Sequence, residues 1–313
     1  MPGKKESIPF RLERENVSGC DRSDPIIGGI VLGEMIETIY EPDNSLKKGY
    51  LSIFKEIFEE LRQNRWLTYQ LFKRDLLSMY KQSFVGILWA IILPLASVGT
   101  FITLNSSGLF SINDTDAPYA IYAMLGMAFW QLFSTSLVAG SNSLVSAGSM
   151  ILKINFSKKS LVIGSTGKSV VSFFVQIILV GILLTWYGIA PSFAAFLIPV
   201  LVIPLMLLTL GLGFIMSILN GIVRDIGNVI LVLLTFLMFL TPILYAKPHT
   251  GILAKVTTYN PLYYLISVPR DLVLSGTIHE WEGFAVASLL SVLVFLVSLI
   301  AFHLTETRIA ERI

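Results

Sequence analysis

Long apolar runs separated by short polar connections dominate the chain from residue 84 onward. An α-helix needs roughly 17 to 25 mainly apolar residues to cross a bilayer, and six runs have about this length. The runs cover residues 84–104, 119–140, 170–188, 194–219, 229–245 and 284–302. The pattern therefore predicts an all-α integral membrane protein with six transmembrane helices in residues 84–302 and a short tail at 303–313.

A polar stretch with helical periodicity precedes the first run. Residues 66–82 (WLTYQLFKRDLLSMYKQ) place apolar side chains near helical spacing, and residues 51–65 form a second amphipathic, heavily charged stretch. Helices of this kind lie along a membrane surface, so residues 50–83 are predicted to be amphipathic interface helices. Residues 1–49 hold too little apolar material for a core of their own and are expected to be a partly ordered N-terminal segment.

Composition and charge support a membrane protein and exclude nucleic acid as a partner. The chain is 54% hydrophobic and only 14% charged, which is wrong for a soluble protein of 313 residues. Residues 1–82 contain 13 basic and 13 acidic side chains, so they offer no net basic patch. The start of the chain lacks an apolar run of signal-peptide length, and the single Cys20 cannot form an internal disulfide.

The charges of the connections predict an orientation in the membrane. The connection at 142–169 carries four lysines and no acid, whereas the connection after the first run holds Asp114 and Asp116 and no base. The four lysines are Lys153, Lys158, Lys159 and Lys168. Because basic connections stay on the cytoplasmic side, both termini of the six-span chain are expected to be cytoplasmic.

The last external connection, at 246–283, has an unusual composition. It contains NPLYYLISVPRDLVLSG, which is apolar enough to enter a bilayer and is interrupted by Pro261 and Pro269. Irregular backbone at membrane depth is tolerated where other protein covers it. We therefore expect an external re-entrant hairpin between the fifth and sixth spans, with Asn260, Pro261 and Arg270 as its key residues.

The stretch GSTGKS at 164–169 resembles the end of a nucleotide-binding P-loop. Gly167, Lys168 and Ser169 match the pattern G-x-x-x-x-G-K-[ST], but Val162 stands where the first glycine is required. The stretch also runs directly into the third predicted span, without a soluble α/β domain around it. It is interpreted as a flexible cytoplasmic lead-in to that helix, with Lys168 as a topological anchor.

The predicted spans lack the residues that power or catalyse a reaction. Their notable polar residues are Gln131 and Gln176, neither of which titrates, so ion-coupled transport lacks its usual relay. The three histidines, His249, His279 and His303, show no metal-ligand spacing. We expect no catalytic residue, metal or cofactor in this chain, and a separate partner as the source of energy.

Four stretches resemble the permease subunits of ABC exporters that move polysaccharides and polyol phosphates, including O-antigen, capsule and teichoic acid. They are IYEPDNS with the helix that follows it, FKRDLLSMYKQSFVGILWAIILPL at 72–95, SMILKINFSKKSLVIG, and TPILYAKPHTGILAKVTTYNPLYYLISVPRDLVLSG. Together they cover roughly residues 36–276; Ser157 stands where the family often has proline. The resemblance implies a homodimer of permeases in a bacterial inner membrane, two ABC ATPase subunits that bind ATP and Mg, and a lipid-linked glycan as substrate.

The resemblance also implies that the loops after the second and fourth spans contact the ATPase. The residues expected there are Lys153, Asn155, Phe156, Lys158, Lys159, Arg224 and Asp225. Each has a structural alternative, because the lysines also set topology and Arg224 with Asp225 also suits a surface ion pair.

Two further groups of residues are candidates for contact with the substrate. Lys73, Arg74, Tyr80 and Lys81 lie where a lipid phosphate approaches from the inner leaflet, although lysine and arginine also reach to headgroups without specificity. Pore aromatics for stacking on sugars are Trp89, Tyr122, Phe129 and Trp130, and helix packing is the alternative. A permease for drugs or simple lipids and a membrane glycosyltransferase remain as rival functions.

Overall fold

Helices account for all regular structure in the part of the chain that the computed structural model describes, namely residues 50–81, 88–107, 118–148, 156–190, 192–248 and 250–309. The all-α class is confirmed for these residues. The elements are α2 (Tyr50–Gln63), α3 (Arg65–Lys81), α4 (Trp89–Ser106), α5 (Tyr119–Ala147), α7 (Lys159–Trp186), the 3-10 helix η2 (Phe193–Leu197), α8 (Ile198–Leu201), α9 (Ile203–Ile222), α10 (Ile226–Leu240), α11 (Gly251–Tyr259), α12 (Pro261–Ser275) and α13 (Trp281–Ile309). The predicted segment 1–49 and residues 310–313 of the predicted tail lie outside the described residues.

Four helices within the described ranges are long and apolar enough to cross a membrane. They are α5, α7, the stretch Ala195–Ile222 that ends in α9, and α13 from Trp281 to Glu306. The other two predicted runs are also helical, as α4, which contains Pro94, and as α10, which has 15 residues. At a rise of about 1.5 Å per residue, α10 is about 22 Å long, shorter than a hydrocarbon core of about 30 Å.

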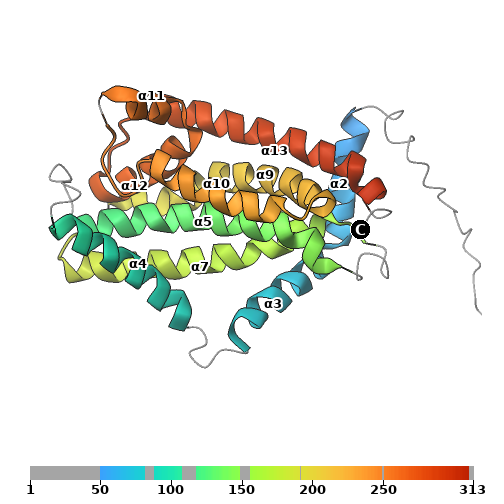
Figure 1. Cartoon of the computed structure of the whole chain (residues 1–313), viewed down its shortest axis with the longest axis horizontal. Coiled ribbons are helices and arrows are strands. Elements are labelled where there is room, and N and C mark those ends of the chain that lie inside the picture. The colour runs from blue at the N-terminus through green and yellow to red at the C-terminus, as the bar shows by residue number, and fades with distance from the viewer. Residues whose placement is uncertain are drawn as a thin grey trace, which may run out of the picture. The chain divides into compact units, whose positions relative to one another are not determined.

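The central helix of the bundle is α5 (Figure 1). It packs chiefly against α7 and α9, and 78% of its apolar stretch is buried, against 28% in each of the other three long helices. Glycines allow the closest approaches: a Cβ added to Gly140 would lie 3.4 Å from the Cα of Gly213 in α9. In α9, a Cβ added to Gly211 would lie 2.9 Å from the Cα of Phe295 in α13. Small residues thus set the spacing between these helices, as is typical of membrane helix pairs.

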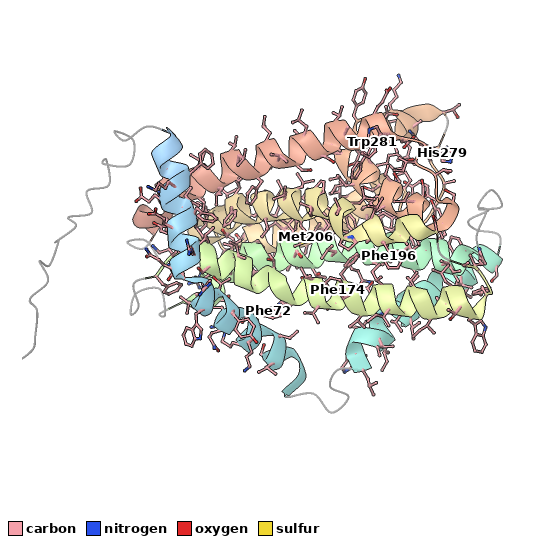
Figure 2. The ribbon with its side chains drawn as sticks, turned by 180° about the vertical axis from the view of Figure 1, so that it is seen from behind. Phe72, Phe174, Phe196, Met206, His279 and Trp281 are labelled. Carbon is pink, nitrogen blue, oxygen red and sulfur yellow. The ribbon has the colours of Figure 1, made fainter. Side chains whose placement is uncertain are left out.

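The outward faces of the bundle carry large exposed apolar side chains. On α10, Val232, Leu233 and Phe236 are each more than half exposed. Phe174 of α7 and Phe196 of η2, both labelled in Figure 2, are 56% and 84% exposed. Faces of this composition suit contact with lipid tails or with another apolar helix.

The two ends of the bundle carry different short helices (Figure 1). Helix α2 crosses one end, next to the start of α7, while α11 and α12 cover the other. We call these the Lys159 end and the Arg270 end, after the buried cation that each contains.

Gly126→Ala is expected to destabilise the protein, because the new Cβ would lie 2.5 Å from the backbone carbonyl oxygen of Ile243 and one of the two segments must shift. The expected loss in the free energy of unfolding is about 1–3 kcal/mol. Thermal unfolding in detergent measures it. Gly181→Ala in α7 is the matched control, since nothing lies within 4 Å of its added Cβ. Equal stability of Gly126→Ala and the wild type would contradict the close packing.

Candidate functional site

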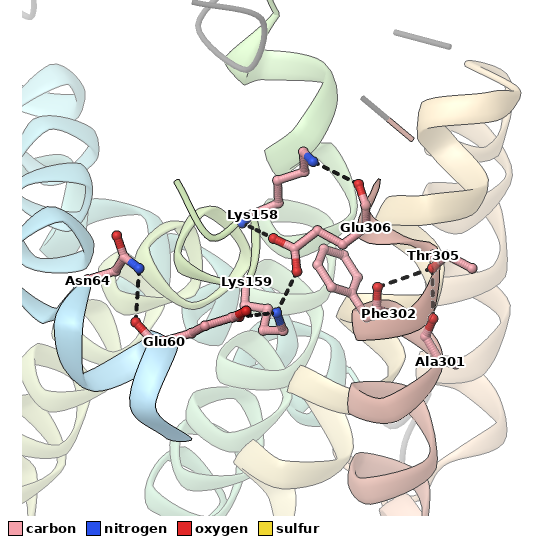
Figure 3. Close-up of polar contacts among 8 residues, drawn as sticks. All are labelled: Glu60, Asn64, Lys158, Lys159, Ala301, Phe302, Thr305 and Glu306. Atoms are coloured by element: carbon pink, nitrogen blue, oxygen red, sulfur yellow. Dashed lines mark hydrogen bonds and ion pairs between the residues drawn. The ribbon is translucent and has the colours of Figure 1, made fainter. Parts of the chain in front are cut away.

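A fully buried lysine lies at the first residue of α7. The ammonium of Lys159 contacts the carboxylate of Glu60 at 2.6 Å and that of Glu306 at 2.5 Å (Figure 3), and the Lys159 side chain is 0% exposed. Glu60 belongs to α2 and Glu306 to α13. One ammonium therefore joins the N-terminal interface helix, the beginning of α7 and the last helix.

Glu306 also forms hydrogen bonds with Lys158, the residue that precedes Lys159. Its carboxylate accepts the backbone N–H of Lys158, and its backbone carbonyl accepts a hydrogen bond of 2.7 Å from the Lys158 ammonium. Partial burial lowers the pKa of Lys158, while the Glu306 carboxylate opposes this effect. Two lysines and two glutamates thus form a cluster of balanced charge, which is the condition under which buried ions are tolerated.

His303 lies beside these carboxylates. Ligand atoms of Glu60, His303 and Glu306 lie within 4.8 Å of one another, a spacing that suits a metal ion. However, the Lys159 ammonium already contacts both carboxylates and supplies the positive charge. The geometry therefore describes an internal ion-pair cluster, which we call the Lys159 cluster: Lys158, Lys159, Glu60 and Glu306.

Sequence reasoning placed Lys158 and Lys159 in an ATPase-contacting loop and missed their partners. Glu60 and Glu306 are 99 and 147 positions away from Lys159 along the chain, so spacing gives no signal of the contact. Phe156, expected in the same loop, packs partly buried against the apolar cluster at the Lys159 end. Lys153 and Asn155 lie outside the described residues.

The turn between α9 and α10 is fixed by the buried Asn220. Its amide nitrogen donates to the backbone carbonyl of Ser141 at 3.1 Å and to the side-chain oxygen of Asn142 at 2.9 Å, both in α5. Its amide oxygen accepts the backbone N–H of Gly227 at 3.0 Å. Arg224 and Asp225, between these anchors, are exposed. The turn is thus a rigidly held projection with its two charges facing outward.

The stretch GSTGKS at 164–169 lies inside α7, so the expected flexible lead-in to the helix is wrong. A Cβ on Gly164 would lie 3.2 Å from the Thr68 carbonyl oxygen, and one on Gly167 would lie 2.6 Å from the Phe72 ring. The two glycines therefore form a groove that receives α3. Close helix packing, and not flexibility or phosphate binding, explains them.

Helix α3 carries the residues expected to contact lipid phosphate. Lys73 and Arg74 are exposed, and Arg74 pairs with Asp75 at 2.9 Å. Tyr80 and Lys81 are in the last turn of the helix, and their side chains lie outside the described set.

The four expected pore aromatics occupy different environments. Trp89 in α4 is 44% exposed, whereas Tyr122, Phe129 and Trp130 of α5 are buried within the chain. Phe129 packs against Phe173 with a ring distance of 5.3 Å, which is a contact between α5 and α7. The three α5 residues are thus buried among the helices of this chain, and a pore role for them stays a prediction.

At the opposite end, Arg270 of α12 is 4% exposed and lies over the Tyr122 ring at 4.0 Å. Its guanidinium donates to the Ile243 carbonyl at 3.3 Å and to the Asp271 carboxylate at 3.1 Å. These contacts join α12 to α5 and to the segment that follows α10.

Asn260 holds the junction between α11 and α12. Its side-chain oxygen accepts the backbone N–H of Leu262 at 3.0 Å and so caps α12, and its nitrogen donates to the Thr241 hydroxyl at 2.8 Å. Pro261 occupies the first helical position, where its missing N–H has no cost.

Comparison with known proteins agrees with this architecture. A family model described as ABC-2 type transporter matches residues 67–274, which is more than half of the chain. The chain belongs to this family. It is a multi-pass membrane protein, as the ABC-2 match and the four long apolar helices together indicate.

Similar proteins include three O-antigen export permeases. The O-antigen export system permease protein RfbA of Klebsiella pneumoniae is 28% identical over 244 residues, or 76% of this chain and 91% of that protein. A second RfbA from the same organism is 27% identical with the same coverage. The RfbA of Myxococcus xanthus is 28% identical over 189 residues, or 60% of this chain and 72% of that protein.

The limits of the ABC-2 match divide the Lys159 cluster. Lys158 and Lys159 lie within the matched residues 67–274, whereas Glu60 in α2 and Glu306 in α13 lie outside them. The cluster therefore ties the ABC-2 portion of the chain to its two flanking helices.

Asn220→Ala is expected to lower the free energy of unfolding by about 1–3 kcal/mol, because it leaves buried partners of the amide without hydrogen bonds. Hydrogen exchange should rise in residues 220–228, which lose their anchors to α5. Asn228→Ala, at the exposed third residue of α10, is the control and should change neither quantity. Unchanged exchange in Asn220→Ala would show that the turn does not depend on the buried amide.

Proposed function

We propose that this chain is the membrane-spanning subunit of an ATP-driven exporter of a lipid-linked polysaccharide of the O-antigen type. The observation that carries the proposal is the similarity to three permeases named for O-antigen export, over up to 76% of the chain, within the ABC-2 family. The lack of ionisable groups in the middle of the described spans suits a chain that receives its energy from a partner.

The proposed setting is a bacterial inner membrane with the Lys159 end in the cytoplasm. The lysines at 153–168 support this orientation by the positive-inside rule, and both termini would then be cytoplasmic. In this arrangement α4 and α10 complete six spans. Helices α11 and α12, joined at Asn260, would form the external re-entrant hairpin, with Arg270 and Asn260 supplying the internal hydrogen bonds that such a segment requires.

The partner in this proposal is an ABC ATPase subunit that binds ATP and Mg outside this chain. The exposed Arg224 and Asp225, on a turn held by Asn220, are suited to dock on its surface. The segment 148–159, with Phe156, would form a second contact. Two copies of the chain and two ATPase subunits would make the complete exporter.

The substrate in this proposal reaches the protein from the inner leaflet. Lys73 and Arg74 on α3 are exposed cations that suit a lipid phosphate or pyrophosphate, and Tyr80 and Lys81 continue the same helix. The groove formed by Gly164 and Gly167 seats this helix on α7.

Deletion of the gene is expected to abolish polysaccharide at the cell surface and to accumulate lipid-linked polymer inside the cell, because assembly continues without export. Staining of surface glycan and extraction of the lipid-linked fraction measure the two quantities, and a plasmid copy of the wild type is the control. Intact surface polysaccharide with altered sensitivity to drugs would instead support a permease for drugs or simple lipids.

Simultaneous replacement of Arg224 and Asp225 by alanine is expected to reduce polymer exported per ATP hydrolysed by about tenfold, which is within the usual range of coupling between sites. The ATPase would still bind and hydrolyse ATP, since no residue of its own has changed. Proteoliposomes containing the whole complex allow both rates to be measured. Lys255→Ala, an exposed cation at the Arg270 end, is the control. Wild-type coupling in the double variant would remove the turn from the proposed interface.

A further inference from the structure

We infer that the Lys159 cluster is a mechanical joint between the segment 148–159, which is proposed to contact the ATPase, and helix α2. Movement of that segment would pass through α2 to α3, which carries the proposed phosphate contacts Lys73 and Arg74. Lys159, Glu60 and Glu306 are then positioning residues for export, acting through other groups and not on the substrate itself. The inference rests on the proposed function, and it adds Glu60 and Glu306 to the residues on which coupling depends.

The buried ion pairs of Lys159 constrain three helices. Its ammonium is fully buried and contacts carboxylates from two other helices at 2.6 and 2.5 Å. Moving the start of α7 away from either helix would remove one of the two carboxylate partners of a buried charge, which is unfavourable. The start of α7, α2 and the end of α13 are therefore constrained to move together.

Helix α2 makes both apolar and ionic contacts at this end of the bundle. Ile53 and Ile57 insert into a cluster that includes Leu161 and Phe302. Apolar burial is non-directional, so it specifies the position of a helix less sharply than an ion pair does. The ion pair from Glu60 adds a fixed point, so displacement of α7 becomes displacement of α2.

At the junction between α2 and α3, Asn64 alone separates the two helices. The Asn64 side chain donates to the Glu60 carbonyl at 2.9 Å, and the Thr68 backbone N–H and hydroxyl donate to the Asn64 carbonyl at 2.9 and 3.1 Å. A continuous set of contacts thus runs from Lys159 through Glu60 and Asn64 into α3. Lys73 and Arg74 lie further along that helix.

The decisive comparison uses two adjacent glutamates of α2. Glu60→Gln removes the charge that pairs with Lys159 but leaves Glu306 in place, so the buried ammonium keeps one partner. Glu59→Gln removes an equal charge from an exposed pair with Lys55, at 3.9 Å, and is the matched control. A second pair, Lys159→Met and Lys159→Arg, removes or keeps the buried charge at similar side-chain length.

The complete complex of permease and ATPase, in proteoliposomes with lipid-linked polymer, provides the functional measurement. Glu60→Gln is expected to reduce polymer exported per ATP about fivefold and Lys159→Met about tenfold or more, in line with typical coupling between sites. Glu59→Gln should match the wild type, and Lys159→Arg should recover most of the loss. Wild-type coupling in Glu60→Gln would overturn the inference, and this variant decides the question if Lys159→Met fails to accumulate.

Hydrogen exchange of the purified permease tests the joint without any export assay. Exchange in residues 50–63 is expected to rise in Glu60→Gln relative to Glu59→Gln, and equal exchange in the two variants would overturn the joint. Failure of the wild-type complex to export polymer would instead refute the proposed function. The joint and the proposed export function can therefore be refuted independently.

Discussion

A charged or hydrogen-bonding group that is shut away from water requires a partner inside the protein, and this constraint governs both ends of the helix bundle. At the Arg270 end, the buried guanidinium lies over Tyr122 and donates to the carbonyl of Ile243. At the Lys159 end, the buried ammonium is shared between Glu60 and Glu306. Each cation fixes segments that are distant in sequence. Between the two ends, the bundle depends on close packing at glycines, as where Gly140 approaches Gly213.

The hydrophobic pattern was sufficient to predict the helices, because a bilayer demands long apolar runs and leaves few alternatives. Each of the six predicted runs contains a helix, although residues 241–245 at the end of the fifth run form turns and bends. The same pattern could not reveal which residues contact one another in the folded chain. Lys159 was interpreted through its charge and its loop, but its partners are 99 and 147 positions away, and a count of charges does not encode such a contact. The glycines at 164 and 167 were similarly ambiguous, since a glycine permits both flexibility and close approach, and the positions of Thr68 and Phe72 in α3 distinguish the two.

The Lys159 end combines buried and exposed charges that suit different tasks. Exposed pairs such as Lys55 with Glu59 contribute little to stability, because water and salt screen them. Arg224 and Asp225 are likewise exposed, but the turn that carries them is anchored by the three hydrogen bonds of Asn220. A charge on a rigid support is available to a partner at little entropic cost. A charge that is buried and balanced, as that of Lys159 is, is instead unavailable to a partner and stabilises the chain's own geometry.

The Lys159 cluster joins residues inside the ABC-2 match to residues outside it. The matched residues 67–274 include Lys159 but neither glutamate, since Glu60 precedes the match and Glu306 follows it. The two flanking helices are thus not loosely appended. Each contributes one of the two carboxylates that pair with the buried ammonium of Lys159 in the matched portion. Because α2 continues through Asn64 directly into α3, the helix that faces the inner leaflet in the proposed orientation is connected to the start of α7 by polar contacts at every step. Under the inferred mechanism, a displacement of Lys159 would pass through Glu60 and Asn64 to the helix where a lipid phosphate would arrive.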